Sequence, residues 1–597
     1  MTENDDSYAV LYKSFEEKGN LDQEIVDLEA AISRTPDDVG ALGHLAYAFS
    51  LVKRDQVAES TYRKALVLAS DNAYLHWGLG CAVDRQGRYD EAIAAYREAL
   101  RLGADDETLW VNLGVALKET GQFDEATFAY REAQRVDPDY ADAHYNLGML
   151  LNESGRLAEA EAEFRVAVRL APDVLDAWLG LGHALDDLER KEEAVEVYHL
   201  ALRINPDYAD AHYYLGTALL GLENLAEAAV ELGEAVRLAP DDPYAWLGLG
   251  YALDHLERNE EAVEAYREAL QINPEYADAY SRLAEVFLKI GRNGEAETAS
   301  REAVRLDPQD ADAWLGLGDA LDELKKPGDS EKAYREALRI DPDFADAHYN
   351  LGILLLVNDR PAEAEEELRE AVRLAQDDSD NWRALGDALN DLEKHEEAVE
   401  AYRKALSINP EYANAHHNLG VALEDTDRHE ECADAYRGAI RLMPDDYHAH
   451  YGLAWAYERL GRLDEAAAEY TEAARLEPEN WWPYYNLGNV LRDQEKYVDA
   501  LSTYRRAVQL NPGDTDVHEN LGFVLGNLGQ MDQAVGEYRE AIRLDGDNVD
   551  AHSGLGGILL KLGDVDGAVA ECREALRLDP DDADASACLA EALGQIP

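Results

Sequence analysis

The sequence predicts an all-α fold, an α-α superhelix of stacked helical hairpins, and three observations support this. Alanine recurs every 34 residues from Ala31 to Ala575, seventeen times without an insertion or deletion. Glycine or alanine recurs with the same period from Ala46 to Ala590, while Tyr12 holds that place in the first unit. Apolar and small residues fall in two blocks of helical spacing in each period. A lone hairpin cannot bury its apolar face, so the period predicts a stack of hairpins.

Each unit, counted from Asp5 as position 1, is expected to form two helices. Its apolar and small residues lie at positions 3 to 11 and again at positions 17 to 30. Between the blocks lies a turn such as Ser154-Gly155-Arg156, where glycine can take the left-handed conformation that ends a helix. After the second block stands Pro-Asp, as at Pro172, which stops one helix and offers a cap to the next.

Proline follows the same frame. It occupies position 32 in thirteen of the seventeen units. Elsewhere, Pro243 and Pro483 are expected to open first helices, and Pro327 and Pro361 to open second helices, because the first helical turn does not need the N–H that proline lacks.

One unit carries a full set of marker residues at positions 4, 7, 8, 20, 24, 27 and 32. They are Trp246, Leu249, Gly250, Ala262, Tyr266, Ala269 and Pro274. This pattern resembles the tetratricopeptide repeat (TPR) family. The resemblance implies a right-handed solenoid of antiparallel hairpins whose first helices line a concave groove. It also implies that this groove binds a protein segment.

The resemblance covers residues 5–582, which we interpret as seventeen tandem units after an N-terminal tail at 1–4. Residues 583–597 supply a partial unit, a single first helix. From about 107 to 446 a double unit of 68 residues is visible, because tryptophan alternates with histidine or tyrosine at position 4. The middle of the array is therefore expected to have grown by duplication of hairpin pairs.

The chain is strongly acidic, with 124 acidic against 55 basic residues and a net charge of −69. Such a surface repels nucleic acid and anionic membranes, so we expect neither as a partner. The acidic excess and the small number of lysines, 14 beside 41 arginines, resemble proteins of salt-accumulating halophiles. At about 1 M salt the Debye length is about 3 Å, which screens the self-repulsion.

We expect a soluble, cytoplasmic protein. The start of the chain has no basic segment followed by an apolar signal core, and no apolar stretch reaches membrane-spanning length. Four cysteines are scattered without metal-ligand spacing and are interpreted as structural.

Histidine is frequent at position 4, which raises the question of metal binding. Equivalent positions in successive hairpins lie about 8–10 Å apart, whereas zinc needs ligand atoms about 2 Å from the ion. We therefore interpret these histidines as partly buried packing residues. The sequence also lacks a phosphate-binding glycine loop and a Gly-x-Ser-x-Gly motif, so we expect no catalytic residue, no metal, no cofactor and no enzyme.

The resemblance implies that positions 2, 5, 9, 12 and 13 of the first helices face the groove. Acidic pairs such as Asp186-Asp187 and Asp322-Glu323 alternate there with apolar residues such as Tyr213. These strips suit an extended segment with basic and apolar side chains. The same acids also fit a general solvating surface.

Asparagine recurs at position 6, where it resembles the remains of a ladder that grips the backbone of an extended peptide in related superhelices. The members are Asn112, Asn146, Asn350, Asn418, Asn486 and Asn520.

Two groups of large residues fall at expected groove positions. We call the first the aromatic patch: Tyr451, Trp455, Arg459, Trp482, Tyr485, Asn489 and Arg492. The second is an N-terminal cluster of Tyr47, Tyr74 and Trp77. Aromatic residues with arginine are typical of binding hot spots. Local packing is the alternative interpretation of both groups.

The sequence thus favours a non-catalytic scaffold or adaptor that binds an extended protein segment in its groove, with the aromatic patch as anchor. A second hypothesis is a structural protein that assembles end to end as a homo-oligomer. It rests on residues 583–597, whose only charged side chains are Asp584 and Glu591, which makes a poor polar cap.

Overall fold

The computed structural model describes residues 21–595, and within them the protein has thirty-four helices and no strand. The predicted all-α fold is confirmed. The expected tail at 1–4 and the first helix expected after it, which includes Tyr12, lie outside the described residues.

Two series of helices alternate along the chain. The first helices of the units are α3 (Val39–Leu51), α5 (Ala73–Asp84), α7 (Glu107–Glu119), α9 (Ala141–Glu153), α11 (Leu175–Asp187), α13 (Ala209–Gly221), α15 (Pro243–His255), α17 (Ala277–Lys289), α19 (Ala311–Glu323), α21 (Ala345–Val357), α23 (Ser379–Asp391), α25 (Ala413–Glu424), α27 (Tyr447–Arg459), α29 (Trp482–Asp493), α31 (Thr515–Asn527), α33 (Val549–Lys561) and α35 (Ala583–Gln595).

The second helices follow them. They are α2 (Leu21–Arg34), α4 (Asp55–Leu68), α6 (Tyr89–Arg101), α8 (Phe123–Val136), α10 (Leu157–Leu170), α12 (Lys191–Ile204), α14 (Leu225–Leu238), α16 (Asn259–Ile272), α18 (Asn293–Leu306), α20 (Pro327–Ile340), α22 (Pro361–Leu374), α24 (His395–Ile408), α26 (His429–Leu442), α28 (Leu463–Leu476), α30 (Tyr497–Leu510), α32 (Met531–Leu544) and α34 (Val565–Leu578).

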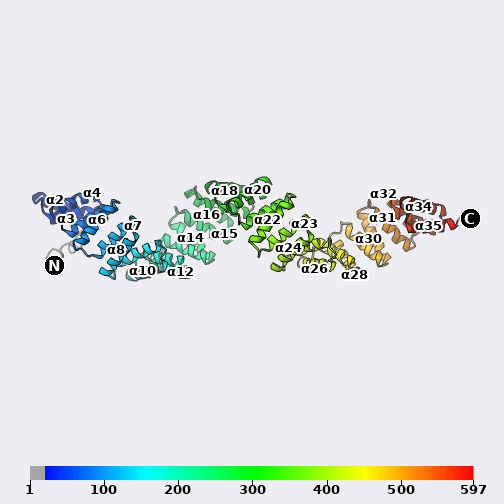
Figure 1. The fold of residues 1–597 in the computed structure, drawn as a ribbon, viewed down its shortest axis with the longest axis horizontal. Coiled ribbons are helices and arrows are strands. Elements are labelled where there is room, and N and C mark those ends of the chain that lie inside the picture. The colour runs from blue at the N-terminus through cyan, green and yellow to red at the C-terminus, as the bar shows by residue number, and fades with distance from the viewer. Residues whose placement is uncertain (1–20, 596–597) are drawn as a thin grey trace. The chain divides into compact units, whose positions relative to one another are not determined.

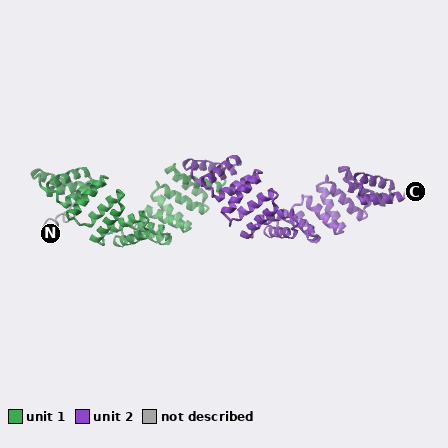
Figure 2. Ribbon diagram, viewed as in Figure 1, with its two compact units in different colours: residues 1–292 green, residues 293–597 purple. Residues whose placement is uncertain are grey.

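The chain divides into two compact units, residues 1–292 and 293–597 (Figure 2). The first holds the described helices α2 to α17, and the second holds α18 to α35. Within each unit the helices pair as hairpins in chain order, and each hairpin packs against the next (Figure 1). The four prolines expected at helix starts lie in the first two residues of α15, α29, α20 and α22.

Fifteen of the sixteen described hairpin turns have a left-handed residue at position 15, and Asp427 is the exception. Gly155 has this conformation, with φ 71°, as the sequence predicts. Eight other turns place a residue with a side chain there, for example Glu257 at φ 58° and Lys325 at φ 57°. A left-handed residue other than glycine costs about 1–2 kcal/mol, so the packing of the hairpins imposes this conformation.

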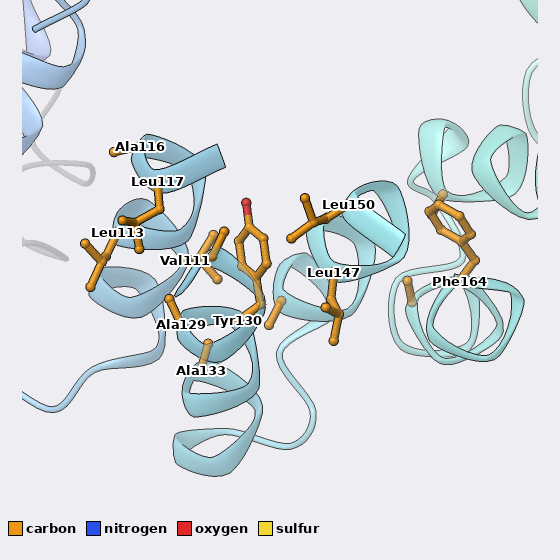
Figure 3. Close-up of a cluster of buried hydrophobic side chains, with 14 of the residues drawn as sticks. Val111, Leu113, Ala116, Leu117, Ala129, Tyr130, Ala133, Leu147, Leu150 and Phe164 are labelled. Atoms are coloured by element: carbon orange, nitrogen blue, oxygen red, sulfur yellow. The ribbon is translucent and has the colours of Figure 1, made fainter. Parts of the chain in front are cut away.

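The core is built around the aromatic residue at position 24. Tyr130 on α8 is fully buried, and Figure 3 shows its ring between the helices that carry Leu117 and Leu150, α7 and α9. Gly114 at position 8 gives the ring its room, because a Cβ there would lie 2.4 Å from Tyr130 Cε1. The small residues that recur at position 8 are therefore needed for close packing, as expected.

The same ring also contacts the next hairpin. A Cβ built on Gly420, in the same unit as Tyr436, would lie 2.7 Å from the Tyr436 ring. A Cβ built on Gly452, at position 6 of the following unit, would lie 2.4 Å from that ring on its other side. The aromatic side chain thus fills the space between two consecutive first helices and couples neighbouring hairpins.

Arginines join neighbouring units along the second helices. Arg190 contacts Glu193 of its own unit at 2.7 Å and Glu161 of the preceding unit at 2.8 Å. Arg360 repeats this arrangement with Glu363 at 2.6 Å and Glu331 at 2.8 Å. A planar guanidinium can serve two carboxylates at once, which gives a reason for the excess of arginine over lysine.

Position 4 carries a second link between units. Four indole N–H groups, those of Trp178, Trp246, Trp314 and Trp382, donate to the backbone carbonyl six residues earlier at 3.0–3.2 Å. Eight histidines place Nε2 against the equivalent carbonyl at 2.9–3.2 Å: His76, His144, His212, His348, His416, His450, His518 and His552. Trp and His alternate there because each presents a ring nitrogen to the same acceptor.

Six of the eight histidines, all except His76 and His416, also contact a glutamate nineteen residues later. Nδ1 of His450 lies 2.6 Å from Glu469 Oε2, and Nδ1 of His518 lies 2.6 Å from Glu537 Oε2. Most units with Trp have alanine at this position, such as Ala265 nineteen residues after Trp246, which leaves room for the larger indole. The histidines are packing residues, as expected, and six of them also belong to a partly buried polar pair.

Each of these imidazoles has acceptors on both nitrogens, and only the protonated ring has two N–H donors. The bond to Glu469 raises the pKa of His450, the Pro444 carbonyl and Glu472 act in the same direction, and burial opposes them. The bond to Glu537 likewise raises the pKa of His518, with the Pro512 carbonyl and Glu540 acting in the same direction. A raised pKa in the folded state means that the pair stabilises the fold fully below the unfolded value of about 6.5, and that this contribution is lost as pH rises through the folded-state pKa.

Gly114→Ala should destabilise the protein by about 1–3 kcal/mol, because the added methyl overlaps the Tyr130 ring. Gly536→Ala on α32 is the matched control, since a Cβ there meets no atom within 4 Å and alanine is the better helix former by about 1 kcal/mol. Urea unfolding followed by circular dichroism should show opposite shifts. Equal stabilisation by both changes would contradict the proposed close contact.

The histidine pairs predict a pH dependence of stability. Against the effect of burial, their bonds raise the pKa of four of these histidines, His144, His348, His450 and His518. A variant with Trp in place of each of these four histidines, and Ala in place of its glutamate, keeps the bond to the carbonyl and removes the titrating group. The urea midpoint of the natural chain should fall more than that of the variant between pH 6 and 8.5. Parallel curves would show that the histidines are not charged in the fold.

Candidate functional site

The clearest hollow on the first helices lies near the C-terminus, in the second compact unit (residues 293–597). We call it the C-terminal groove; its volume is about 480 Å³. It is lined by Arg492 on α29, Glu519, Asn520, Phe523, Gly526 and Asn527 on α31, Tyr538 on α32, Asp550, Ser553, Gly554, Gly557, Ile558 and Lys561 on α33, and Asp584 and Cys588 on α35. Most of these residues stand at positions 2, 5, 6, 9, 12 and 13, which include those that the TPR resemblance assigns to the groove.

The aromatic patch is divided among several local contacts. Tyr451 stacks on Tyr447 with ring centroids 6.0 Å apart, and its hydroxyl accepts from Asn486 Nδ2 at 2.6 Å. This bond joins α27 to α29. The guanidinium of Arg459 lies 5.6 Å from the Trp455 ring, and the edge of that ring meets His429 at 5.6 Å.

The start of α29 presents the most accessible aromatic group of the patch. Trp482 stacks on Trp481 with centroids 4.3 Å apart and contacts Tyr485 at 6.1 Å. Nearly half of Trp482, 49%, stays exposed. A stacked indole with an open face is suited to bury a partner's apolar side chain.

The last two members of the patch have internal partners. Asn489 accepts a hydrogen bond from the core hydroxyl of Tyr504 at 2.6 Å. Arg492 bonds Asp493 at 2.8 Å and also contacts Asn520, and it lines the C-terminal groove. Arg492 therefore connects the predicted patch with a groove that the sequence did not predict.

The asparagines at position 6 bond within the chain. Asn350 donates to Asp319 at 2.9 Å and Asn418 donates to Asp387 at 2.8 Å, so each amide reaches the preceding unit. Asn112 contacts the sulfur of Cys81 at 3.6 Å. Asn146 and Asn520 donate to the carbonyls of residues 142 and 516 at 2.8 and 2.9 Å. A ladder for a partner's backbone thus remains a hypothesis that competes with these internal bonds.

Some acidic residues of the first helices are partly buried, whereas others, such as Asp187 and Glu323, are exposed. Burial raises the pKa of Asp319 to about 6, although the hydroxyl of Tyr334 and Asn350 bond to it. Asp254 is only 5% exposed and pairs with Lys289 Nζ at 2.7 Å. These acids are therefore more than a solvating surface, since some of them join consecutive units.

The N-terminal cluster lies in the first compact unit (residues 1–292). Tyr74 and Trp77 have ring centroids 6.3 Å apart on α5. Tyr47 on α3 and Trp77 are half-buried and pack against the core of that unit. Their positions fit the packing interpretation as well as a binding role.

No candidate metal centre is found among residues 21–595, where no three His, Cys, Asp or Glu side chains gather closely enough to hold an ion. In the same residues, no helix has both the length and the apolar character needed to cross a membrane. The four cysteines are free thiols, and three of them are buried.

Comparison with protein families identifies the class. The model described as the Cilia and flagella-associated protein 70 C-terminal domain matches residues 172–385 and 376–592. Two further models, described as a tetratricopeptide repeat and a TPR repeat, match residues 111–174 and 84–121. The chain belongs to the tetratricopeptide repeat family, in the form that the first of these models describes. The resemblance inferred from the sequence is thereby confirmed. No curated protein gives a significant match.

Several solved structures are also similar. YrrB, described as a TPR protein with an unusual peptide-binding site, is 28% identical over 31% of this chain and 95% of its own, with a TM-score of 0.28. The Cut9-Hcn1 hetero-tetramer of APC/C is 18% identical over 83% of this chain and 98% of its own, with a TM-score of 0.33. MamA is 26% identical over 27% of this chain and 95% of its own, with a TM-score of 0.27.

The C-terminal groove is the functional candidate that sequence reasoning missed. A signal was present in Gly526, Gly554 and Gly557, which place glycine at positions 12, 6 and 9 of two adjacent units. Of the three, Gly557 faces open space, whereas Ile558 packs closely over Gly526 and Tyr538 over Gly554. Glycine has no side chain, so a pattern of large residues at groove positions does not include it.

Proposed function

We propose that the protein is a non-catalytic scaffold that holds a protein segment along its first helices. Tetratricopeptide repeat folds typically serve as protein-protein interaction scaffolds. The observation that carries the proposal is the groove lined by first-helix residues of consecutive units. The partly exposed indole of Trp482 lies on α29, the helix that also supplies Arg492 to the groove. The proposal takes the chain to act in the cytoplasm, without a cofactor.

The charge of the chain specifies the partner further. With a net charge of −69, the protein attracts cationic segments over long range at low salt and over a few ångströms at high salt. The exposed aromatic groups supply apolar contacts. The partner we propose is therefore an extended protein segment with basic and apolar side chains, and neither nucleic acid nor a membrane.

End-to-end assembly of identical chains is the alternative. On α35, Leu593 is 45% exposed and Ala590 is exposed on the same helix. A second copy that covered this surface would form a heterologous contact, which propagates unless it closes into a ring. Removal of 583–597 should then abolish assembly, whereas for a scaffold the same removal lowers stability only.

The aromatic patch gives a direct test of the scaffold. Peptides selected from a displayed random library on the natural chain should bind a variant with Trp455→Ala and Trp482→Ala at least about tenfold more weakly, since hot-spot aromatics contribute about 2 kcal/mol or more each. Fluorescence anisotropy would measure the affinity, and circular dichroism should show unchanged helicity.

Phe128→Ala is the control, because Phe128 is an exposed aromatic residue, 60% accessible, on the second helix α8. It should bind the same peptides as the natural chain does. Unaltered affinity in the Trp455 and Trp482 variant would remove the patch from the proposal.

A further inference from the structure

The C-terminal groove has an apolar floor that glycine leaves uncovered. Phe523 is 44% exposed at the groove, whereas Ile558 beside it is buried. A Cβ built on Gly557 would meet no atom within 4 Å, so the backbone of α33 faces open space there. Gly554 is closely covered by the Tyr538 ring, 2.5 Å from a Cβ built at that position. The hollow can therefore take an apolar side chain against Phe523 and the α33 backbone.

Carboxylates from three consecutive first helices border the same hollow. They are Glu519 on α31, Asp550 on α33 and Asp584 on α35. Glu519 accepts a hydrogen bond from Asn548 at 3.0 Å. Within residues 21–595, none of the three carboxylates has a lysine or arginine within ion-pair distance.

Two cationic side chains, those of Arg492 and Lys561, also line the groove. Arg492 is held by Asp493 and Asn520, away from a direct bond to Glu519. Lys561 stands at the end of α33, at position 13. The carboxylates therefore outnumber the cations available to them, in a hollow partly shielded from water.

The chain offsets only part of the electrostatic cost of burying Glu519. Burial raises the pKa of Glu519 and the charges of Asp550 and Asp516 raise it further, while the bond from Asn548 and the charge of Arg492 lower it, and the net shift is upward. A positive charge placed between Glu519 and Asp550 would favour both ionised carboxylates. A cationic side chain in this place gains more than it would on an open surface, because low local polarity strengthens the attraction.

From these contacts we infer that the C-terminal groove binds a protein segment that places a lysine or arginine between Glu519 and Asp550 and an adjacent apolar side chain over Phe523 and Gly557. The inference rests on the proposed scaffold function and names the partner chemistry of one site on it. A volume of about 480 Å³ lies within the range of about 300–1,000 Å³ that is usual for ligand pockets, so the groove accommodates a few side chains and not a folded domain.

The test uses the full chain and a displayed library of random twelve-residue peptides. Peptides selected on the natural protein should be enriched in a basic residue beside an apolar one. A variant with Glu519→Gln and Asp550→Asn should bind the selected peptides about thirtyfold more weakly, as expected when a partly buried charge pair loses one side. The control, Asp532→Asn with Asp566→Asn, removes the same charge from exposed positions on α32 and α34 and should bind normally.

A second variant tests the hollow itself. Gly557→Leu has room to fold, and its side chain would fill the space assigned to the partner's apolar group. It should abolish binding of the selected peptides, while Gly536→Leu, which also meets no atom within 4 Å of its Cβ on α32, should leave binding unchanged.

The possible outcomes distinguish this inference from the proposed scaffold function. If selected peptides bind the natural chain and both groove variants equally, the inference is wrong and the scaffold function stands. If free spermine displaces the peptides completely and binds as tightly itself, the site recognises a soluble cation and the inference is wrong. If no peptide is enriched on the natural chain, both the inference and the scaffold function are wrong.

Discussion

The structure depends on the contact between the aromatic ring at position 24 and the small residues of two first helices. Tyr436 lies against Gly420 of its own hairpin and Gly452 of the next, at distances that leave no room for a Cβ. A single hairpin cannot supply both sides of this contact. Each hairpin is therefore stabilised by its neighbours, which accounts for a 34-residue period that tolerates no insertion from Ala31 to Ala575.

This packing does not involve every position of the first helices, and several of the other positions make polar contacts between repeats. Position 4 joins units through an indole or imidazole bonded to a backbone carbonyl, and several acids and amides at positions 6 and 9 join them through Asp319 and Asp387. Where Gly557 stands at position 9, the first-helix surface opens into the C-terminal groove. We propose that a partner segment binds there.

The sequence predicted the fold almost completely because the contact of an aromatic ring at position 24 repeats in twelve of the seventeen units and fixes the spacing of both helices. It did not predict the polar link of His450 with Glu469, since the two residues are nineteen apart and only the stacked fold brings them together. It also did not predict that Asn489 would bond the core hydroxyl of Tyr504, because position alone does not give the direction of a side chain. The groove beside Phe523 was missed because glycines, which mark a hollow, carry no chemical signal of their own.

The central claim is that single chains act as scaffolds for another protein segment and do not assemble with each other. The most direct test is the mass of the purified chain by light scattering in molar KCl, across a hundredfold range of concentration. The account predicts 66.3 kDa throughout. A mass that grows with concentration, and returns to that of one chain when 583–597 is removed, would contradict the claim and favour an assembling solenoid.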